Sequence, residues 1–446
     1  MGGRRAARRL REAPVESALV QDMTPEGQGL ATLAGKRVFI DGALTGEQVS
    51  LRRVRARRQY DEAELLEVLA ASPERVVPRC TWFGRCGGCT LQHLSAAGQL
   101  QLKQAVLADN LERIGHVEPR RWLTPVEGPA WGYRRRARLS VRHVEAKGRV
   151  LVGFSERGNP RVTDMLGCET LHPAAAALIA PLSGLIGALS LRQRIPQVEL
   201  AVTDAATALV IRVLDEPTAA DLARLREFRD RHGLRLLLQR SGAGDLTPLD
   251  AGIDDAELSY RLDGDSLVLT FGPTDFIQVN AAINERLLAL AVELLTPGPG
   301  SRLLDLYCGI GNFTLPLARR AAEVLGVEGD ARAVARARHN AALNGIGNAV
   351  FRAADLAGAD ASAAWGTARF DAVLLDPPRA GAAAVLAPLA ACGAARIVYI
   401  SCHPGTLARD AGVLVHEHGF ALAAAGILDM FPATSHVESV ALFERS

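Results

Sequence analysis

The chain has little of several residue types, and each scarcity narrows the class of protein. Of its 446 residues only three are lysine and only 5% are aromatic. Its seven cysteines are an odd number, and the basic first residues, MGGRRAARRLRE, are followed by no apolar segment of a secretory signal. Apolar runs such as 382–391 are too short to cross a bilayer. We therefore expect a cytoplasmic protein with no membrane partner and no disulfide framework.

The small net charge of +2 conceals an uneven distribution of charge along the chain. Residues 1–150 carry 26 Lys and Arg against 16 Asp and Glu, whereas the remaining residues carry 25 against 33. A basic front part joined to an acidic rear part indicates that one region holds a polyanion. The alternative is that the basic residues only solvate a surface.

Residues 1–70 are expected to form a basic tail and a small all-β module. Short alternating or β-branched runs separated by Gly and Asp predict a five-stranded barrel; they are 17–20, 30–33, 37–40 and 49–57. The stretch DMTPEGQGLATLAGKRVFIDGALTGEQV resembles a TRAM domain, an OB-like RNA-binding barrel. Arg53, Arg55 and Arg57 share one strand face, which suits phosphates but equally suits an edge strand protected by charge.

Residues 71–271 mix strands and helices and are expected to form a central α+β domain. The predicted strands are 138–142, 150–154, 198–202, 208–213, 235–238 and 267–271. The predicted helices are 173–189, which Pro181 and Gly184 can interrupt, and 219–231.

Strands and helices alternate regularly in residues 272–446, which predicts a doubly wound parallel α/β sheet. The strands are 302–308, 324–328, 350–353, 372–375, 397–401, 424–428 and 439–444, and the helices are 312–320, 331–343, one after Gly381 and one from Thr406. Ligands of such a sheet bind beyond the carboxyl ends of its strands.

A nucleotide-type cofactor site is predicted in DLYCGIGNFTLPLA, at the end of the first of these strands. Gly309 and Gly311 let the backbone turn tightly and approach a ligand. Glu328, at the end of the next strand, can bind ribose hydroxyls, and Asp355 can accept a hydrogen bond from an adenine amine. Thr314 stands where a dinucleotide fingerprint has its third glycine, which favours S-adenosylmethionine over NAD.

A candidate nucleophile is Cys402 in IVYISCHP, at the carboxyl end of a strand. Uridine C5 is too weakly nucleophilic to take a methyl group directly, but a thiolate that adds to C6 activates it, and a base must then remove the C5 proton. A thiolate is reachable near neutral pH, which suits this reversible addition. The alternative is a buried cysteine that acts as a small apolar residue.

Two further segments carry polar groups near the same strand ends. In VLLDPPR, two prolines fix an extended turn, so that Asp376 and nearby carbonyls can face a flat base. Amino-group methyltransferases share such a motif, and in that reading Cys402 is dispensable. In DMFPATSHVESV, Glu438 lies beside His436 and can serve as the base, although a carboxylate at a strand is often only solvated.

Together these ordered motifs resemble the RNA uracil-C5 methyltransferase family, in its 23S rRNA type. The resemblance implies a Rossmann-like class I methyltransferase domain, with Cys402 as nucleophile and Glu438 as proton acceptor. The positions that it implies for S-adenosylmethionine binding are Gln278, Tyr307, Asn312, Glu328, Asp355 and Asp376. His403 departs from the family, which usually has Asn after the nucleophile.

A cysteine cluster opens the central region: Cys80, Cys86 and Cys89, with Cys168 as the fourth member. Four thiolates suit zinc or an iron–sulfur cluster, and the spacing favours neither. The resemblance implies a [4Fe-4S] cluster on these four residues, structural or RNA-contacting, since the methyl transfer needs no electrons. Cys308 and Cys392 are assigned to the core.

The expected partner is a single-stranded or loop region of 23S rRNA, with no obligate protein partner. GYRRRARLSVR sets Arg134, Arg135, Arg136 and Arg138 near aromatic residues, a combination that suits unstacked bases. The arginines can also be fortuitous on a solvated strand. Two alternatives stay open: the same methylation on tRNA, whose branch of the family lacks the barrel and the cysteines, and a non-catalytic rRNA-binding assembly factor.

Overall fold

The computed structural model describes residues 14–242, 245–254, 257–264, 266–358 and 361–445. The chain forms two compact units, which are Met1–Val106 with Pro432–Ser435, and Leu107–Phe431 with His436–Ser446. The basic tail expected in residues 1–13 lies outside the described residues. No helix of the described residues is long and apolar enough to cross a membrane.

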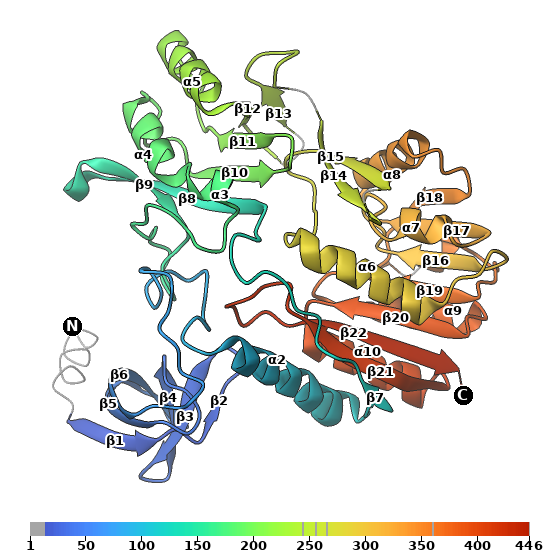
Figure 1. The fold of residues 1–446 in the computed structure, drawn as a ribbon, viewed down its shortest axis with the longest axis horizontal. Helices are drawn as coiled ribbons and strands as arrows, with labels where there is room; N and C mark the ends of the chain where they lie inside the picture. Colours follow the sequence, from blue (N-terminus) through green and yellow to red (C-terminus); the bar gives the residue numbers. More distant parts are fainter. Residues whose placement is uncertain (1–13, 243–244, 255–256, 265, 359–360, 446) are drawn as a thin grey trace. The chain divides into compact units, whose positions relative to one another are not determined.

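The first unit is built on one six-stranded sheet (Figure 1) in the order β1-β5-β6-β4-β3-β2. Its strands are β1 (Val15–Leu19), β2 (Asp22–Met23), β3 (Gln28–Leu33), β4 (Lys36–Asp41), β5 (Gln48–Ala56) and β6 (Tyr60–Ala70). The expectation of five strands is therefore wrong, because the sheet has six, and neither β2 nor β6 was among the expected runs. Only Asp61 and Ala63 of β6 are buried, so its sequence shows little apolar alternation.

The arginine stripe of β5 is paired with carboxylates of the same unit. Arg53 bridges Glu16 and Asp61 at 2.8 Å each, and Arg55 lies 3.3 Å from Glu62. Strand β5 runs between β1 and β6, but its pairing with β1 ends at Arg52. Among the described residues, Arg53 and Arg55 therefore lie on a stretch of β5 that pairs with β6 alone, which agrees with the interpretation as an edge protected by charge. These ion pairs partly neutralise the arginines, so the stripe attracts phosphates less strongly than its sequence predicts.

The second unit begins with the end of helix α2 (Ala96–Asn110) and contains a second six-stranded sheet, of order β13-β12-β11-β10-β8-β9. Its strands are β8 (Arg136–Val144), β9 (Arg149–Gly153), β10 (Gln197–Val202), β11 (Thr207–Arg212), β12 (Leu234–Gln239) and β13 (Leu246–Pro248). The first predicted helix is broken into α3 (Pro173–Ala176) and α4 (Ile179–Ala188), and the second is α5 (Ala219–His232). Helix α2 and strand β13 were not predicted.

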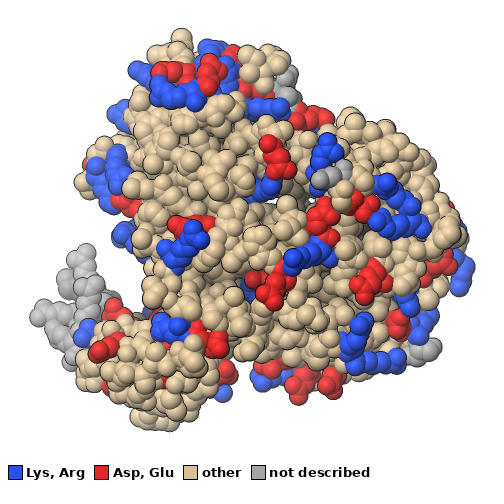
Figure 2. Space-filling model, in the orientation of Figure 1, with Lys and Arg blue, Asp and Glu red and all other residues tan. Residues whose placement is uncertain are grey.

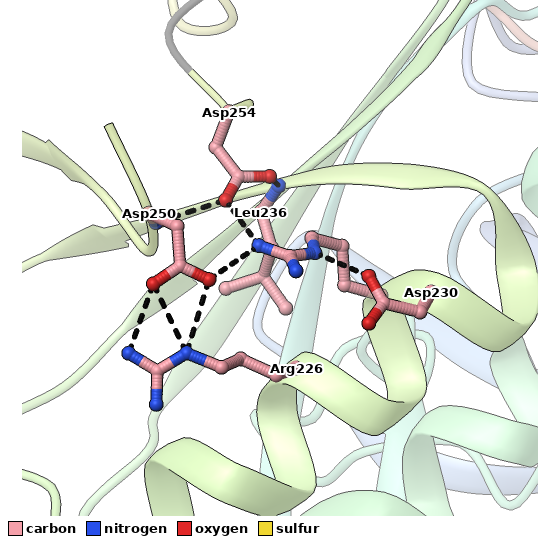
Figure 3. A network of polar contacts seen from close by, with 6 residues as sticks. Arg226, Asp230, Leu236, Asp250 and Asp254 are labelled. Carbon is pink, nitrogen blue, oxygen red and sulfur yellow. Dashed lines mark hydrogen bonds and ion pairs between the residues drawn. The ribbon is translucent and has the colours of Figure 1, made fainter. Parts of the chain in front are cut away.

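A buried ionic network fixes α5 to this sheet (Figure 3). Arg229, 6% exposed, donates to Asp250 at 2.7 Å and to Asp254 at 2.9 Å. Asp254 also accepts from the backbone N–H of Leu236 in β12, and Arg226 forms a bidentate pair with Asp250. The charges are thus paired and hydrogen-bonded, as burial requires. The network holds the segment after β13 against α5 and β12.

The rest of the second unit is an α/β layer around an eight-stranded sheet, of order β18-β17-β16-β19-β20-β22-β21-β7. Its strands are β16 (Arg302–Leu306), β17 (Glu323–Glu328), β18 (Ala349–Ala353), β19 (Ala372–Leu375), β20 (Arg396–Ser401), β21 (Phe420–Leu428), β22 (Glu438–Arg445) and β7 (Arg121–Trp122). Its helices are α6 (Ala281–Leu295), α7 (Thr314–Ala318), α8 (Ala331–Leu343), α9 (Ala383–Ala391) and α10 (Pro404–His416). In Figure 1, α6 runs across β19 and β20, against which it packs. A hairpin of β14 (Leu258–Leu262) and β15 (Leu267–Phe271) joins the same core.

The sheet is not wholly parallel, which corrects the prediction. Strands β18, β17, β16, β19 and β20 are parallel, but β22 pairs antiparallel with β20 and with β21. Ser401 lies opposite Ser439 in this pairing. Cys402 directly follows β20, and Glu438 is the first residue of β22. The register therefore brings the thiol and the carboxyl to the same end of the sheet.

Candidate functional site

A cavity of about 720 Å³ lies beyond the carboxyl ends of the parallel strands, within the second unit. It is lined by seven of the eight residues predicted as catalytic or cofactor-binding, which are Gln278, Tyr307, Glu328, Asp355, Asp376, Cys402 and Glu438. They come from six different strand ends and one loop. A cavity of this volume is in the range of small-molecule sites. The Gly-rich loop and the thiol therefore share one pocket.

At the cofactor end, the loop after β16 is held by backbone contacts. Tyr307 adopts a positive φ of 65°, which is rare for a residue with a side chain, and the following turn uses Gly309 and Gly311 with positive φ. Glu328 accepts hydrogen bonds from the N–H of Gly309 at 3.1 Å and of Asp330 at 3.0 Å. The β17 carboxylate is thereby fixed at the cavity wall beside the Gly-rich turn.

Asn312 is the exception among the predicted residues, because it does not line the cavity. Its amide pairs reciprocally with that of Asn284 on α6, at 2.9 and 3.0 Å, and also accepts from the hydroxyl of Tyr260 at 3.1 Å. Its neighbour Ile310 is held by the buried Asn340 of α8, whose amide donates to the Ile310 carbonyl. The side chain of Asn312 thus holds the Gly-rich loop through contacts with α6 and β14, outside the cavity lining.

Buried acids give the cavity an unusual electrostatic character. Burial, with a contribution from Asp376, raises the pKa of Glu438 to about 8. Burial also raises the pKa of Asp376 to about 7. Below the Gly-rich loop, burial raises the pKa of Asp305 to about 7. Such shifted carboxyl groups are typical of sites that transfer protons.

The thiol of Cys402 is half-buried, and burial raises its pKa, followed by the effect of Glu438. Arg379, from the turn after β19, acts in the opposite direction and lowers this pKa by its charge and a hydrogen bond. Arg379 also contacts the ring of His436 at 3.0 Å, and that ring lies 5.0 Å from the ring of Phe431. The guanidinium of Arg379 therefore acts on the thiol, and the two rings line the same cavity.

His403 stands where the resemblance implied an Asn, and it caps the following helix. It is the N-cap of α10, and its Nδ1 accepts a hydrogen bond from the N–H of Thr406 at 3.2 Å. Asn is a preferred N-cap because its side-chain oxygen accepts the same kind of bond. The imidazole is thus turned into the helix end.

Sequence reasoning missed several residues of the cavity wall, among them Thr274, Phe276 and Leu356. Phe276 is 72% exposed, so an aromatic ring stands at the wall where solvent reaches it. The only signal in the sequence was its place next to Gln278 in DFIQVN. Apolar residues in a loop carry no periodicity, and their role is visible only from the cavity.

The predicted RNA-binding arginines are mostly paired within the second unit. Arg135 lies 2.7 Å from Asp204, and Arg136 and Arg138 both contact Glu199. On the face drawn in Figure 2, basic and acidic side chains are interspersed. Among the described residues, this face therefore shows no extended patch made of basic side chains alone.

The candidate cluster cysteines are divided between the two units. Cys80, Cys86 and Cys89 lie in a turn-rich stretch of the first unit, and Cys168 belongs to the second. The N–H of Gly88 lies 3.4 Å from the sulfur of Cys86, a kind of contact that cluster-bound thiolates commonly receive. The described residues contain no group of three or more His, Cys, Asp or Glu side chains arranged to hold a metal ion.

Comparison with known proteins shows similarity over almost the whole chain. The family model described as tRNA (Uracil-5-)-methyltransferase matches residues 95–446. The chain is 48% identical, over 99% of its length and 100% of the relative's, to the 23S rRNA (uracil(1939)-C(5))-methyltransferase RlmD of Methylococcus capsulatus. It is 49% identical to the protein of the same name from Stenotrophomonas maltophilia, over 99% of both chains.

Among solved structures, the fold is similar to that of the Pyrococcus abyssi tRNA (uracil-54, C5)-methyltransferase in complex with S-adenosyl-L-homocysteine. The TM-score is 0.72, and the match covers 96% of this chain and 100% of that one. At 23% identity this similarity supports the architecture alone.

Proposed function

Because the chain belongs to the uracil-C5 RNA methyltransferase family, we propose that it methylates C5 of a uridine in 23S rRNA. As a member of this family it is an RNA methyltransferase that uses S-adenosylmethionine. The observation that carries the proposal is the opposition of Cys402 and Glu438 at the end of β20 and β22, inside the cavity that also holds the Gly-rich loop.

The proposed reaction begins at the sulfur of Cys402. Its thiolate adds to C6 of the uracil ring, and the electron pair displaced from the C5–C6 bond makes C5 nucleophilic. Arg379 favours the thiolate by its charge. S-adenosylmethionine, when bound, supplies the electrophilic methyl group that C5 attacks.

Glu438 is proposed to complete the reaction. After methylation, C5 still carries its proton, and removal of that proton lets the C6–sulfur bond break and restores the aromatic ring. A carboxyl group with a pKa of about 8 is a strong enough base for a carbon acid that a neighbouring carbonyl activates. Its position opposite Cys402 supports this role, because both groups would then face the same uracil ring.

The cofactor roles are proposed from the cavity wall. Glu328 would bind the ribose hydroxyls, Asp355 the adenine, and Gln278, Tyr307 and Asp376 the remaining groups of S-adenosylmethionine. Asn312 is proposed to act indirectly, by holding the loop through Asn284 and Tyr260.

The choice of 23S rRNA rests on the two relatives named above, both of which match the full length of the chain, including the front part. We propose that residues 1–70 contribute a TRAM-like RNA-binding surface, that residues 71–271 form the central domain and that 272–446 form the methyltransferase domain. A cytoplasmic location is proposed from the substrate. No protein partner is part of the proposal.

The substrate proposal is tested with radiolabelled methyl transfer to 23S rRNA from a strain that lacks this gene. We expect 5-methyluridine as the labelled nucleoside, identified by chromatography and mass spectrometry. The same rRNA from the parent strain should accept almost no label, because its target is already methylated. Preferential labelling of a tRNA transcript would contradict the rRNA assignment, and a methylated amino group would contradict C5 chemistry.

A [4Fe-4S] cluster on Cys80, Cys86, Cys89 and Cys168 is also proposed. Its support is the donor set of four thiols and the N–H contact to Cys86. Such a cluster would brace the loop that carries the first three cysteines, and the methyl transfer requires no redox step from it.

Serine substitution of any of these four cysteines should lower the bound iron and sulfide. Protein purified without oxygen should contain about four of each per chain, measured by colorimetric assays of iron and acid-labile sulfide. The matched control is Cys392→Ser, at a buried cysteine in the α/β layer, which should keep its full iron content. Stoichiometric zinc in place of iron would refute the cluster.

A further inference from the structure

A buried hydrogen-bond centre lies behind the cavity, on the helix that follows the nucleophile. Asp410 of α10 and Tyr399 of β20 are both 0% exposed. The hydroxyl of Tyr399 donates to Asp410 Oδ2 at 2.7 Å, and the N–H of Ala382 donates to the same oxygen at 2.8 Å. Neither residue lines the cavity, so the reaction proposed above does not use them directly.

The second oxygen of Asp410 is held by its neighbour. Arg409 lies 2.7 Å from Asp410 Oδ1, and its guanidinium also donates to the carbonyl of Ala380 at 3.0 Å. The backbone of the turn before Ala382 packs closely against the side chains of Arg409 and Asp410. Gly381 has a φ of 83°, and a Cβ atom there would lie 2.5 Å from Arg409 and 2.7 Å from Asp410.

The connections of Asp410 lead to two segments that line the reactive end of the cavity. Tyr399 stands on β20, three residues before Cys402. Ala380 and Ala382 end the turn that carries Asp376 and Arg379. Asp410 therefore joins the strand that precedes the nucleophile to the turn that carries Asp376 and Arg379, both of which line the cavity with Cys402.

We propose that Asp410 and Tyr399 are positioning residues for the methylation, which hold the 376–381 turn at a fixed distance from Cys402. The inference rests on the proposed function of Cys402. A carboxylate satisfied by one hydroxyl, one backbone N–H and one guanidinium is rigid, because loss of any partner leaves a buried acceptor unpaired. A shift of about 1 Å at a reacting centre can lower a rate on the order of a hundredfold.

The test is Tyr399→Phe, which removes one hydroxyl and keeps the ring. We expect the rate of covalent adduct formation with 5-fluorouridine-containing 23S rRNA, at saturating S-adenosylmethionine, to fall about tenfold or more. The Kd for S-adenosylhomocysteine, measured by calorimetry, should change less than about threefold, since Tyr399 is not among the residues that line the cavity. Asp410→Asn keeps the side-chain volume. It should likewise lower the rate of adduct formation and leave the Kd for S-adenosylhomocysteine nearly unchanged.

The matched control is Tyr260→Phe, which removes the same atom from a tyrosine bonded to Asn312 behind the cofactor loop. Tyr260→Phe should raise the Kd for S-adenosylhomocysteine and leave the rate of adduct formation nearly unchanged. All rates are measured below the melting transition of each variant, so that unfolding does not contribute. An unchanged adduct rate in Tyr399→Phe, or equal losses of rate and affinity in both tyrosine variants, would overturn the inference. Wild-type protein that forms no adduct would refute the proposed function, and this inference with it.

Discussion

Cys402→Ala protein is expected to lose uridine methylation by on the order of 10³-fold or more, because no other group can add to C6. The thiol is half-buried in the cavity opposite Glu438 and beside Arg379, whereas the other cysteines of the α/β layer, Cys308 and Cys392, are buried in its core. The measurement is mass spectrometry of protein incubated with S-adenosylmethionine and 23S rRNA that contains 5-fluorouridine. Fluorine cannot leave as a cation, so a methylated adduct should persist on Cys402 and be absent from the variant.

The control for this experiment is Cys392→Ala, which removes a thiol at the end of α9, outside the cavity. It should form the adduct at the rate of the wild-type protein. Because burial and Glu438 raise the pKa of Cys402, the adduct should also form faster as the pH rises from 7 to 9. Retained methylation in Cys402→Ala would instead favour transfer to an amino group.

Glu438→Gln is expected to stop the reaction at a later step than Cys402→Ala, after methyl transfer. The thiol remains, so the variant can form the C6 bond and accept the methyl group, but it cannot remove the C5 proton. A methylated covalent complex should therefore accumulate with ordinary uridine RNA, and denaturing gel electrophoresis should detect it. Rapid turnover without accumulation would show that another group removes the proton.

The same substitution should change the pH dependence of stability. The pKa of Glu438 is about 8 in the folded protein against 4.5 ordinarily, so the folded state binds more protons than the unfolded state between these values. The free energy of unfolding therefore falls as the pH rises from about 5 to about 8. Gln carries no charge to bury, so the variant should gain, relative to wild type, up to a few kcal/mol at pH 8.5 and little at pH 5.

Urea denaturation at these two pH values measures the difference. The matched control is Glu444→Gln, on the same strand but partly exposed and paired with Arg396, which should change stability by less than about 1 kcal/mol at either pH. An equal effect of Glu438→Gln at pH 5 and at pH 8.5 would show that the carboxyl is not strained by burial.

The elements that the sequence located best are those whose signal is local. Strand β19 and helix α8 have the predicted bounds, because an apolar run and a helical period are written in consecutive residues. The family was also predicted correctly, because the Gly-rich turn, the DPPR turn and the SCHP segment each require particular residues in order. By contrast, the acidic strand β6 was missed because its sequence shows little apolar alternation. Helix α6 was also missed, although its apolar residues recur at helical spacing after an Asn N-cap.

The sequence by itself determined which groups are available: a thiol after one strand, a carboxyl before another, and a glycine turn between them. Only the tertiary structure decided which of them meet. The antiparallel entry of β22 sets Glu438 opposite Cys402, and the amide pair with Asn284 turns Asn312 away from the cavity. Hydrogen-bond partners and strand register join residues far apart in the chain, and the pKa of a carboxyl depends on what surrounds it. A local sequence pattern predicts neither the contacts between distant residues nor the pKa of a buried carboxyl, because both depend on how the folded chain packs.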